Sequence, residues 1–494
     1  MSARVGAPLA LLLLGLGLAG CATTPLEKRE WIAVRTGHYD IWSSLGADET
    51  RRLAVELERF RGAVEYLWGS ALPDEPVRTR VYAMDDRNMP RKFAYEHQRS
   101  FLLSRQRGDV IVLRTGGTWE DDAWTALKLE YARRLLWNAS PDPLPPWLEE
   151  GLPQVASSIT VRGNVAVVGT VRDEHVHTLR EREWIPLERL LAAADLEGWS
   201  NRDREVFEAE SWAVCHYLLL GVEHRSSAQA ELGRFRELVR GGAAPAAAAR
   251  EALAGPVQKT VYSHVVGNQY ETAKLKMPLR SGGSLETRPV ALPEVLIRLG
   301  ELSLAIGEPA QARGYFERAI EREPGAAHAL AGLGDALAAE RDFAGAEERY
   351  RAALAAAPDD ALVELGYANL LAAQARDAAD SARRTQLAGA AREHYQKSRA
   401  LAGSLPEADA GIAATYLLAG EDPAQGRGAL RTARSALPGD AGLTHLDAQL
   451  AIAEGDSVAA HRAATLLVTR ARSVSELESA RALLDSIDVR AAIR

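Results

Sequence analysis

The chain has little cysteine and no excess of positive charge, and its N-terminal hydrophobic run is too short to cross a membrane. Its 494 residues hold two cysteines, so no disulfide framework can stabilise the fold. The formal net charge of −8 argues against a strongly basic nucleic-acid binder, and we expect no nucleic-acid partner. The apolar run at residues 8–20 would form a helix of roughly 20 Å, short of the ~30 Å core of a bilayer.

Tryptophan is missing from the second half of the chain. All ten tryptophans lie between Trp31 and Trp212, and the remainder is rich in Ala, Leu, Glu and Arg. Apolar residues make up 47% and charged residues 26%, which is typical of a globular protein. No glycine-rich phosphate loop, nucleophile elbow or Cys/His dyad is evident, and no cofactor is expected. The asymmetry predicts two different kinds of structure.

The N-terminus has the features of a targeting segment. The apolar run ends Leu18-Ala19-Gly20-Cys21, which resembles the lipobox of bacterial lipoproteins. The resemblance implies a signal peptide at residues 1–20, a lipid on Cys21 and a tether at 21–30. Ala22 in place of Asp implies the outer membrane, with the protein facing the periplasm. The alternative is an ordinary cleaved signal peptide with a fortuitous cysteine. Cys215, in an apolar stretch, is expected to be an inert core thiol.

Residues 31–270 are predicted to form an α+β domain. Short strands are indicated at 31–35, 38–42, 79–83 and 109–113. Helical spacing of apolar residues predicts helices at 48–67 and 121–137, and a further helix that begins at Trp147 after a proline-rich turn.

The two later helices carry the motifs of a known family. Residues 129–133 read L-E-Y-A-R, and residues 145–151 read P-P-W-L-E-E-G. Their order and spacing resemble the peptidase-MA-like, gluzincin-type domains, in which H-E-x-x-H is followed about twenty residues later by P-x-W-L-x-E-G. The resemblance implies a zincin-like fold, with Glu130 at the general-base position and Glu150 at that of the third zinc ligand.

The departure from that motif predicts an inactive domain. Leu129 and Arg133 stand where the family has its two zinc-binding histidines; leucine cannot ligate a metal, and arginine stays protonated. We therefore expect no metal and no catalytic residue here. Glu130 and Arg133 are three residues apart, so the Arg133 guanidinium is predicted to pair with Glu130, Glu150 or both. The alternative is that Arg133 is solvated on the helix surface.

Histidines elsewhere leave an enzymatic alternative open. His175 and His177 would share one face of a strand, and His216 is a further candidate. A zinc metallopeptidase with such rearranged ligands is the alternative hypothesis, although H-x-H is short and unspecific.

From residue 293 the chain repeats itself. Gly300 and Gly334, and Phe316 and Tyr350, are each separated by 34 residues, the period of tetratricopeptide repeats. The pattern resembles that family over 293–490, with about five repeats, the last degenerate. The third repeat carries extra residues, which we expect at 377–386 between its helices. Residues 271–292 are predicted to be a linker, with its boundary near Gly282-Gly283.

The sequence therefore predicts an α+β zincin-like domain followed by an all-α repeat superhelix. We expect a scaffold or adaptor, lipid-anchored in the bacterial cell envelope, whose repeat groove binds a protein or peptide.

Overall fold

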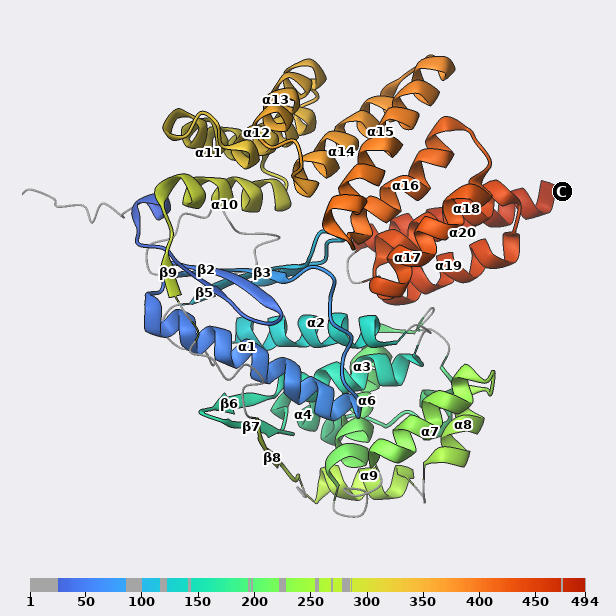
Figure 1. Ribbon diagram of the computed structural model, residues 1–494. Helices are drawn as coiled ribbons and strands as arrows, with labels where there is room; N and C mark the ends of the chain where they lie inside the picture. The colour runs from blue at the N-terminus through green and yellow to red at the C-terminus, as the bar shows by residue number, and fades with distance from the viewer. Residues whose placement is uncertain are drawn as a thin grey trace, which may run out of the picture.

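The computed structural model places an α/β domain beside an arc of helical repeats (Figure 1). It describes residues 25–85, 100–115, 122–140, 144–193, 196, 199–221, 228–253, 257–267, 270–277, 285, 287–471 and 474–493. The lipobox, Cys21 and Gly282-Gly283 lie outside these residues. No helix within the described ranges is long and apolar enough to span a bilayer.

A six-stranded sheet forms the centre of the α/β domain, in the order β4-β5-β3-β2-β1-β9. Its strands are β1 (Ile32–Arg35), β2 (Tyr39–Ser43), β3 (Thr79–Asp85), β4 (Phe101–Leu103), β5 (Val110–Thr115) and β9 (Thr287–Pro289). Strands β2, β3 and β5 are parallel to one another, whereas β1, β4 and β9 pair antiparallel with their neighbours. Alternate residues of these strands enter two different hydrophobic cores, so both faces of the sheet are covered.

Helices cover the lower face of this sheet (Figure 1). Against it lie α1 (Ala47–Trp68) and α2 (Asp122–Ala139), followed by α3 (Pro146–Ser157) and the long α6 (Asn201–Leu220). Smaller helices surround them: α4 (Asp173–Glu181), α5 (Leu187–Ala192), α7 (Ala228–Arg240), α8 (Pro245–Ala252) and α9 (Val257–Val266). A second sheet contains β6 (Thr160–Arg162), β7 (Val165–Val168) and β8 (Ala273–Lys276).

The segment expected to be a linker, residues 271–292, contributes strands to both sheets. β8 pairs with β7, and β9 pairs with β1, so this stretch ties the two sheets together. The linker prediction is therefore wrong for these strands. Their backbone hydrogen bonds are long-range, and no pattern in so short a polar stretch reveals them.

The repeats are helix pairs arranged in an arc. The pairs are α10 (Leu292–Ala305) with α11 (Pro309–Arg322), α12 (Ala327–Ala339) with α13 (Phe343–Ala356), α14 (Ala361–Asp377) with α15 (Ser381–Ala402), α16 (Pro406–Ala419) with α17 (Arg427–Ala436), and α18 (Ala441–Glu454) with α19 (Ser457–Arg470). The final helix is α20 (Val474–Ile493), and short 3-10 turns lie at Leu26–Lys28 and Pro423–Gly426. The extra residues of the third repeat do not form a loop; they lengthen its helices to 17 and 22 residues.

The first repeat shares a core with the upper face of the large sheet. Trp31, directly before β1, and Trp42 and Tyr82 from the strands pack in one cluster with Leu299 of α10 and Phe316 of α11. The Trp42 and Tyr82 rings stack with centroids 5.7 Å apart. The repeats are therefore packed directly against the α/β domain, because their first helices complete its core.

Candidate functional site

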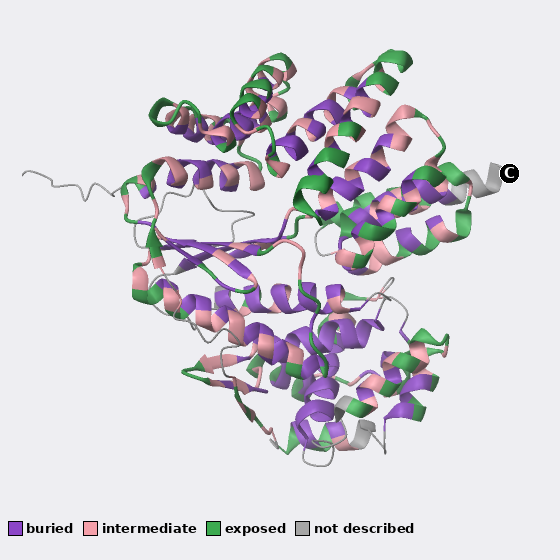
Figure 2. Cartoon of the chain, in the orientation of Figure 1, coloured by how far each residue is buried: buried purple, intermediate pink, exposed green. Residues whose placement is uncertain are grey.

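Helix α3 carries the W-L-x-E-G motif and is buried along its whole length (Figure 2). It packs against α2 on one side and α6 on another. Gly151 lies where α3 meets α6: a Cβ at this position would overlap the Ser211 carbonyl oxygen and come within 2.5 Å of Cys215 Sγ. The glycine thus permits the close approach that fixes the neighbouring Glu150 opposite α2.

Arg133 lies between the two glutamates of the predicted site. Its side chain is 4% exposed; Nη2 donates to both carboxylate oxygens of Glu150 at 3.1 Å, and Nη1 bonds Glu130. The predicted pairing with both glutamates is therefore present, and Arg133 is not a solvated surface residue. Burial alone would lower the pKa of Arg133, but the facing Glu150 and Glu130 carboxylates outweigh it and raise the pKa.

The network continues from Glu150 to a histidine. Gln154 Nε2 donates to Glu150 at 2.8 Å, which leaves the Gln154 carbonyl oxygen to accept from His175 Nε2 at 3.1 Å. Burial, with Arg172 nearby, lowers the pKa of His175 to about 4, so the ring is neutral at physiological pH. His175 thus supports the glutamate through the glutamine and does not face it directly. Gln154 was not singled out from the sequence, although its i+4 spacing from Glu150 could have indicated it.

The histidines proposed as rearranged zinc ligands do not come together. His175 and His177 lie on helix α4, not on a strand, so they point in different directions; His175 is buried and His177 exposed. His216, on α6, bonds the Gly169 carbonyl oxygen at 2.9 Å and His264 at 3.2 Å. Among the residues that the structure describes, no group of three His, Cys, Asp or Glu side chains is placed to hold a metal ion.

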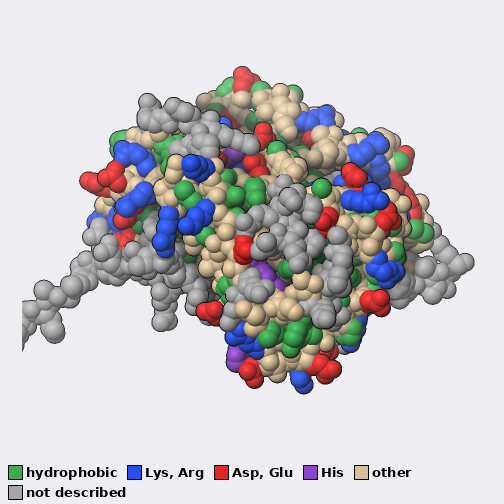
Figure 3. Space-filling view, turned by 90° about the horizontal axis from the view of Figure 1, so that it is seen from below, with side chains coloured by type: hydrophobic (Ala, Val, Ile, Leu, Met, Phe, Trp, Pro, Cys, Tyr) green, Lys and Arg blue, Asp and Glu red, His purple; other side chains and the backbone are tan. Residues whose placement is uncertain are grey.

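A large cavity opens beside Leu129. Its volume is about 1310 Å³, and α1, α2, the end of α3 and the β6–β7 hairpin supply its walls. Its described lining holds the basic residues Arg51, Arg52, Arg59, Lys128, Arg162 and Arg172, against two acidic residues, Glu56 and Glu174. Figure 3 shows lysine and arginine side chains gathered on the left of the lower face. An acidic ligand fits this lining better than a basic one.

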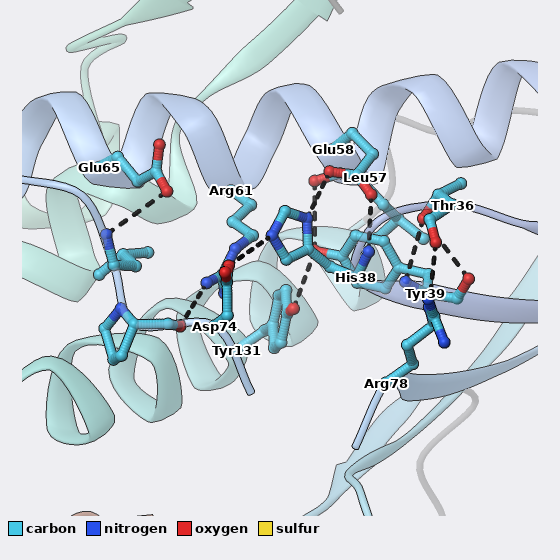
Figure 4. Close-up of polar contacts among 12 residues, drawn as sticks. Thr36, His38, Tyr39, Leu57, Glu58, Arg61, Glu65, Asp74, Arg78 and Tyr131 are labelled. Carbon is cyan, nitrogen blue, oxygen red and sulfur yellow. Dashed lines mark hydrogen bonds and ion pairs between the residues drawn. The ribbon is translucent and has the colours of Figure 1, made fainter. Parts of the chain in front are cut away.

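A second polar cluster, which sequence reasoning missed, surrounds His38 (Figure 4). His38 Nδ1 lies 2.7 Å from Glu58 on α1, and His38 Nε2 lies 3.4 Å from the exposed Asp74. Deeper in the same cluster Tyr131 OH donates to Tyr39 OH at 2.8 Å, and Arg61 donates to the Pro73 carbonyl oxygen at 2.7 Å. These contacts join the turn before β2 and the loop before β3 to α1. We interpret the cluster as structural.

Cys215 and the repeat glycines have clear packing roles. Cys215 is fully buried on α6, and burial raises the pKa of its thiol, which keeps it unreactive.

In the repeats, a Cβ at Gly332 would overlap the Phe316 ring, and one at Gly366 would overlap the Tyr350 hydroxyl. Glycine and aromatic residues therefore interlock between successive helix pairs.

Residues 303–370 match the tetratricopeptide repeat family. The match covers the first repeats, whose glycine and aromatic positions are those just described. No curated protein matches the chain.

Several solved tetratricopeptide repeat and pilus proteins are similar to part of the chain. A thermophilic repeat protein of Thermus thermophilus, TTC0263, is 19% identical over 39% of this chain and 98% of its own, with a TM-score of 0.36. PilW, described as a widely conserved type IV pilus biogenesis factor, is 19% identical over 38% of this chain and 98% of its own, with a TM-score of 0.25. Pseudomonas aeruginosa pilF is 22% identical over 38% and 96%, with a TM-score of 0.22. Likeness at this level says nothing about shared function.

Proposed function

We propose that this protein is a non-enzymatic scaffold of the bacterial cell envelope, lipid-anchored through Cys21 at the outer membrane. Its tetratricopeptide repeats bind a protein or peptide partner. Its α/β domain is a metallopeptidase-like domain that has lost its metal site. The family match at residues 303–370 supports the partner-binding part, and Arg133, buried between Glu130 and Glu150, is the observation that carries the loss of the metal site.

The charge balance of the site supports the loss of zinc. In the active pattern a divalent cation would lie between imidazoles and the carboxylate on the next helix. Here the positive charge shared by the carboxylates is a guanidinium, and both of its terminal nitrogens already donate to them. Leu129 contributes only hydrocarbon. An ion pair of this kind stabilises the largely buried Glu150 carboxylate without a metal, while the Glu130 carboxylate is half exposed.

Rebuilding the motif tests the peptidase-like part of the proposal. The double variant Leu129→His/Arg133→His restores H-E-x-x-H before Glu150, and we expect it to bind about one equivalent of Zn²⁺, against less than about a tenth for the native chain. The measurement is elemental analysis of protein prepared without a histidine tag. Adding Glu150→Gln to the double variant should remove most of that affinity.

Two results would overturn this part of the proposal. Stoichiometric zinc in the native chain would revive the peptidase alternative. A folded double variant that binds no zinc, as judged by circular dichroism and metal content together, would show that the resemblance misplaces the site.

The anchor and the partner need separate tests. Metabolic labelling with palmitate should label the native chain and not Cys21→Ser, and the variant should leave the membrane fraction. For the partner, a photo-reactive residue at exposed Leu362 or Val458 of the repeats should capture the same envelope protein reproducibly, and the purified partner should then bind the native chain directly. Lack of direct binding by every captured protein would contradict the scaffold role.

A further inference from the structure

The inner side of the repeat arc presents a row of polar side chains to the α/β domain. Glu301 of α10, Asp335 of α12 and Asn369 of α14 are spaced 34 residues apart, so they occupy equivalent positions in three successive repeats. Glu407, near the start of α16, joins the row because Asn369 Nδ2 donates to its carboxylate at 2.8 Å. The row is therefore acidic and built by the first helix of each repeat.

Rigid partners hold this row in place. The Tyr395 hydroxyl donates to Asn369 Oδ1 at 2.6 Å, which turns the amide nitrogen toward Glu407. The Tyr350 hydroxyl bonds Asp335 in the same way one repeat earlier. Tyr350 and Tyr395 are the aromatic residues that interlock the repeats, so the acidic groups are positioned by the repeat packing itself.

An arginine from the α/β domain contacts this row at Glu407. Arg107 lies in the turn between β4 and β5, and its Nε and Nη2 donate to the two carboxylate oxygens of Glu407 at 2.9 and 3.1 Å. The pair is bidentate, the geometry that distinguishes guanidinium from ammonium recognition. Both side chains are about three-quarters buried, with 27% and 22% exposed. Burial alone would lower the pKa of Arg107, but Glu407 and Asp335 raise it.

The turn that carries Arg107 is shaped to present it. Gly108 has φ +88°, and a Cβ there would lie 2.8 Å from the Arg78 carbonyl oxygen. Asp109 accepts from the Arg105 backbone N–H at 3.0 Å and from Arg134 at 3.0 Å, which fixes the base of the turn. Beside Arg107, Gln106 donates to Asp440 at 3.0 Å, and Asp440 also caps α18.

We propose that Glu407, oriented by Asn369 and with Asp335 in the same row, forms an arginine-binding site on the inner face of the repeats, and that Arg107 is its built-in occupant. The site itself stands on the contacts above and does not depend on the scaffold role.

Chemical rescue tests the site in the full chain. Arg107→Ala vacates the guanidinium position, and we expect a lower Tm that millimolar ethylguanidinium raises more in the variant than in the native chain. Ethylammonium, with the same charge and no fork of donors, should give no such gain. The matched control is Arg105→Ala in the same turn, because exposed Arg105 donates to the backbone carbonyl oxygens of Ser104 and Ala305.

The outcomes separate clearly. Rescue that disappears in Arg107→Ala/Glu407→Gln supports the site. Equal responses of the Arg107 and Arg105 variants, or rescue by ethylammonium as well, would overturn it.

If Arg107→Ala does not fold, Arg107→Lys and Arg105→Lys are compared by hydrogen exchange of the 104–110 amides. Exchange about tenfold faster in Arg107→Lys alone is expected, since lysine cannot form the bidentate pair. Equal exchange in the two lysine variants would contradict the proposal.

Discussion

Several buried charges in this protein meet an opposite charge from another element. Arg134 of α2 lies with Asp109 beside β5, with side chains 4% and 2% exposed, and Arg470 of α19 lies with Glu149 of α3, with 8% and 3% exposed. Arg133 follows the same rule with Glu150. Such pairs add little net stability, but losing one partner leaves an uncompensated buried charge. Each pair therefore specifies which elements lie together.

Removing Arg133 should reveal the free-energy cost of leaving a buried charge without its partner. Arg133→Met leaves Glu130 and Glu150 facing each other without a cation, and we expect the free energy of unfolding to fall by about 3 kcal/mol. Urea unfolding measures it. The matched control is Arg35→Met, whose ion pair with Asp40 has an arginine side chain 71% exposed and should matter by less than ~1 kcal/mol. Adding Glu150→Gln to Arg133→Met should restore part of the loss; no restoration would argue against carboxylate repulsion.

Glu210 should make the stability depend on pH. Burial raises its pKa from the ordinary value of 4.5 to about 8, although the Ile185 backbone N–H opposes this by donating to it. The folded state therefore holds a proton that the unfolded state loses above pH 4.5, so stability falls as pH rises from there toward 8.

The variant Glu210→Gln removes this titration. We expect it to be more stable than the native chain by about 2–4 kcal/mol near pH 9, and nearly equal near pH 5. Urea unfolding curves of the variant and the native chain at both pH values measure this difference in the free energy of unfolding. Glu205→Gln on the same helix, where the carboxylate is 55% exposed and pairs with Arg182, should show no such gain. A gain of equal size at both pH values would contradict the assignment.

At the scale of elements, glycines opposite aromatic rings set how closely successive helix pairs approach. Phe316 lies against Gly300 and Gly332, and Tyr350 lies against Gly334 and Gly366. The sequence predicted the 34-residue spacing of Gly300 and Gly334 and of Phe316 and Tyr350, whereas the structure showed which glycine lies against which ring. The H-x-H pair shows the opposite case. Residues 173–181 form a helix because its buried face is set by contacts with α6, which the sequence around His175 does not disclose.

The effect of a Gly→Ala substitution in the repeats on the free energy of unfolding should depend on which atoms surround the new methyl group. Gly332→Ala forces the Phe316 ring to move, and we expect a loss of about 1–3 kcal/mol in the free energy of unfolding. Gly314→Ala, on α11 with no heavy atom within 4 Å of the new Cβ, should instead stabilise by roughly 0.5–1 kcal/mol. Thermal unfolding of the two variants compares them directly. Equal effects would mean that helix propensity, and not the interlock, dominates.

At the scale of the whole molecule, the repeats and the α/β domain share a core, so we expect them to unfold as one unit. Their shared core contains Trp31, Trp42 and Leu299, and ion pairs such as Arg107–Glu407 and Arg470–Glu149 also join the two parts. Cutting the chain between the two parts would expose these tryptophans. Either part alone is therefore expected to be less stable than in the full chain, so variants should be compared in the full-length protein.

Two spectroscopic probes can test this unity. All ten tryptophans precede residue 213, so their fluorescence reports the α/β domain, whereas far-ultraviolet circular dichroism reports the helices of both parts, with the larger share in the repeats. We expect the two transitions to coincide in urea. Leu299→Ala, fully buried in the shared core, should move both midpoints together with a loss of about 2–5 kcal/mol. Separate midpoints in the native chain would show two independent units.

The sequence by itself determined the features that are local or periodic. The 34-residue spacing predicted the repeats, and the i,i+3 spacing of Glu130 and Arg133 predicted their ion pair, because one helical turn brings such residues together. The strands around Ile41 and Val81 were likewise predicted from short apolar runs. The peptidase-like identity and the lipid anchor remain predictions.

Only the tertiary structure decided which surfaces the elements bury. It placed β8 and β9 of the expected linker in two sheets, packed α10 on the large sheet, and brought Arg107 to Glu407 across 300 residues of chain. Contacts between residues so distant in sequence depend on the summed packing of every intervening element, and no local pattern encodes them. The repeats were therefore predictable from the sequence, whereas the occupant of their inner face was not.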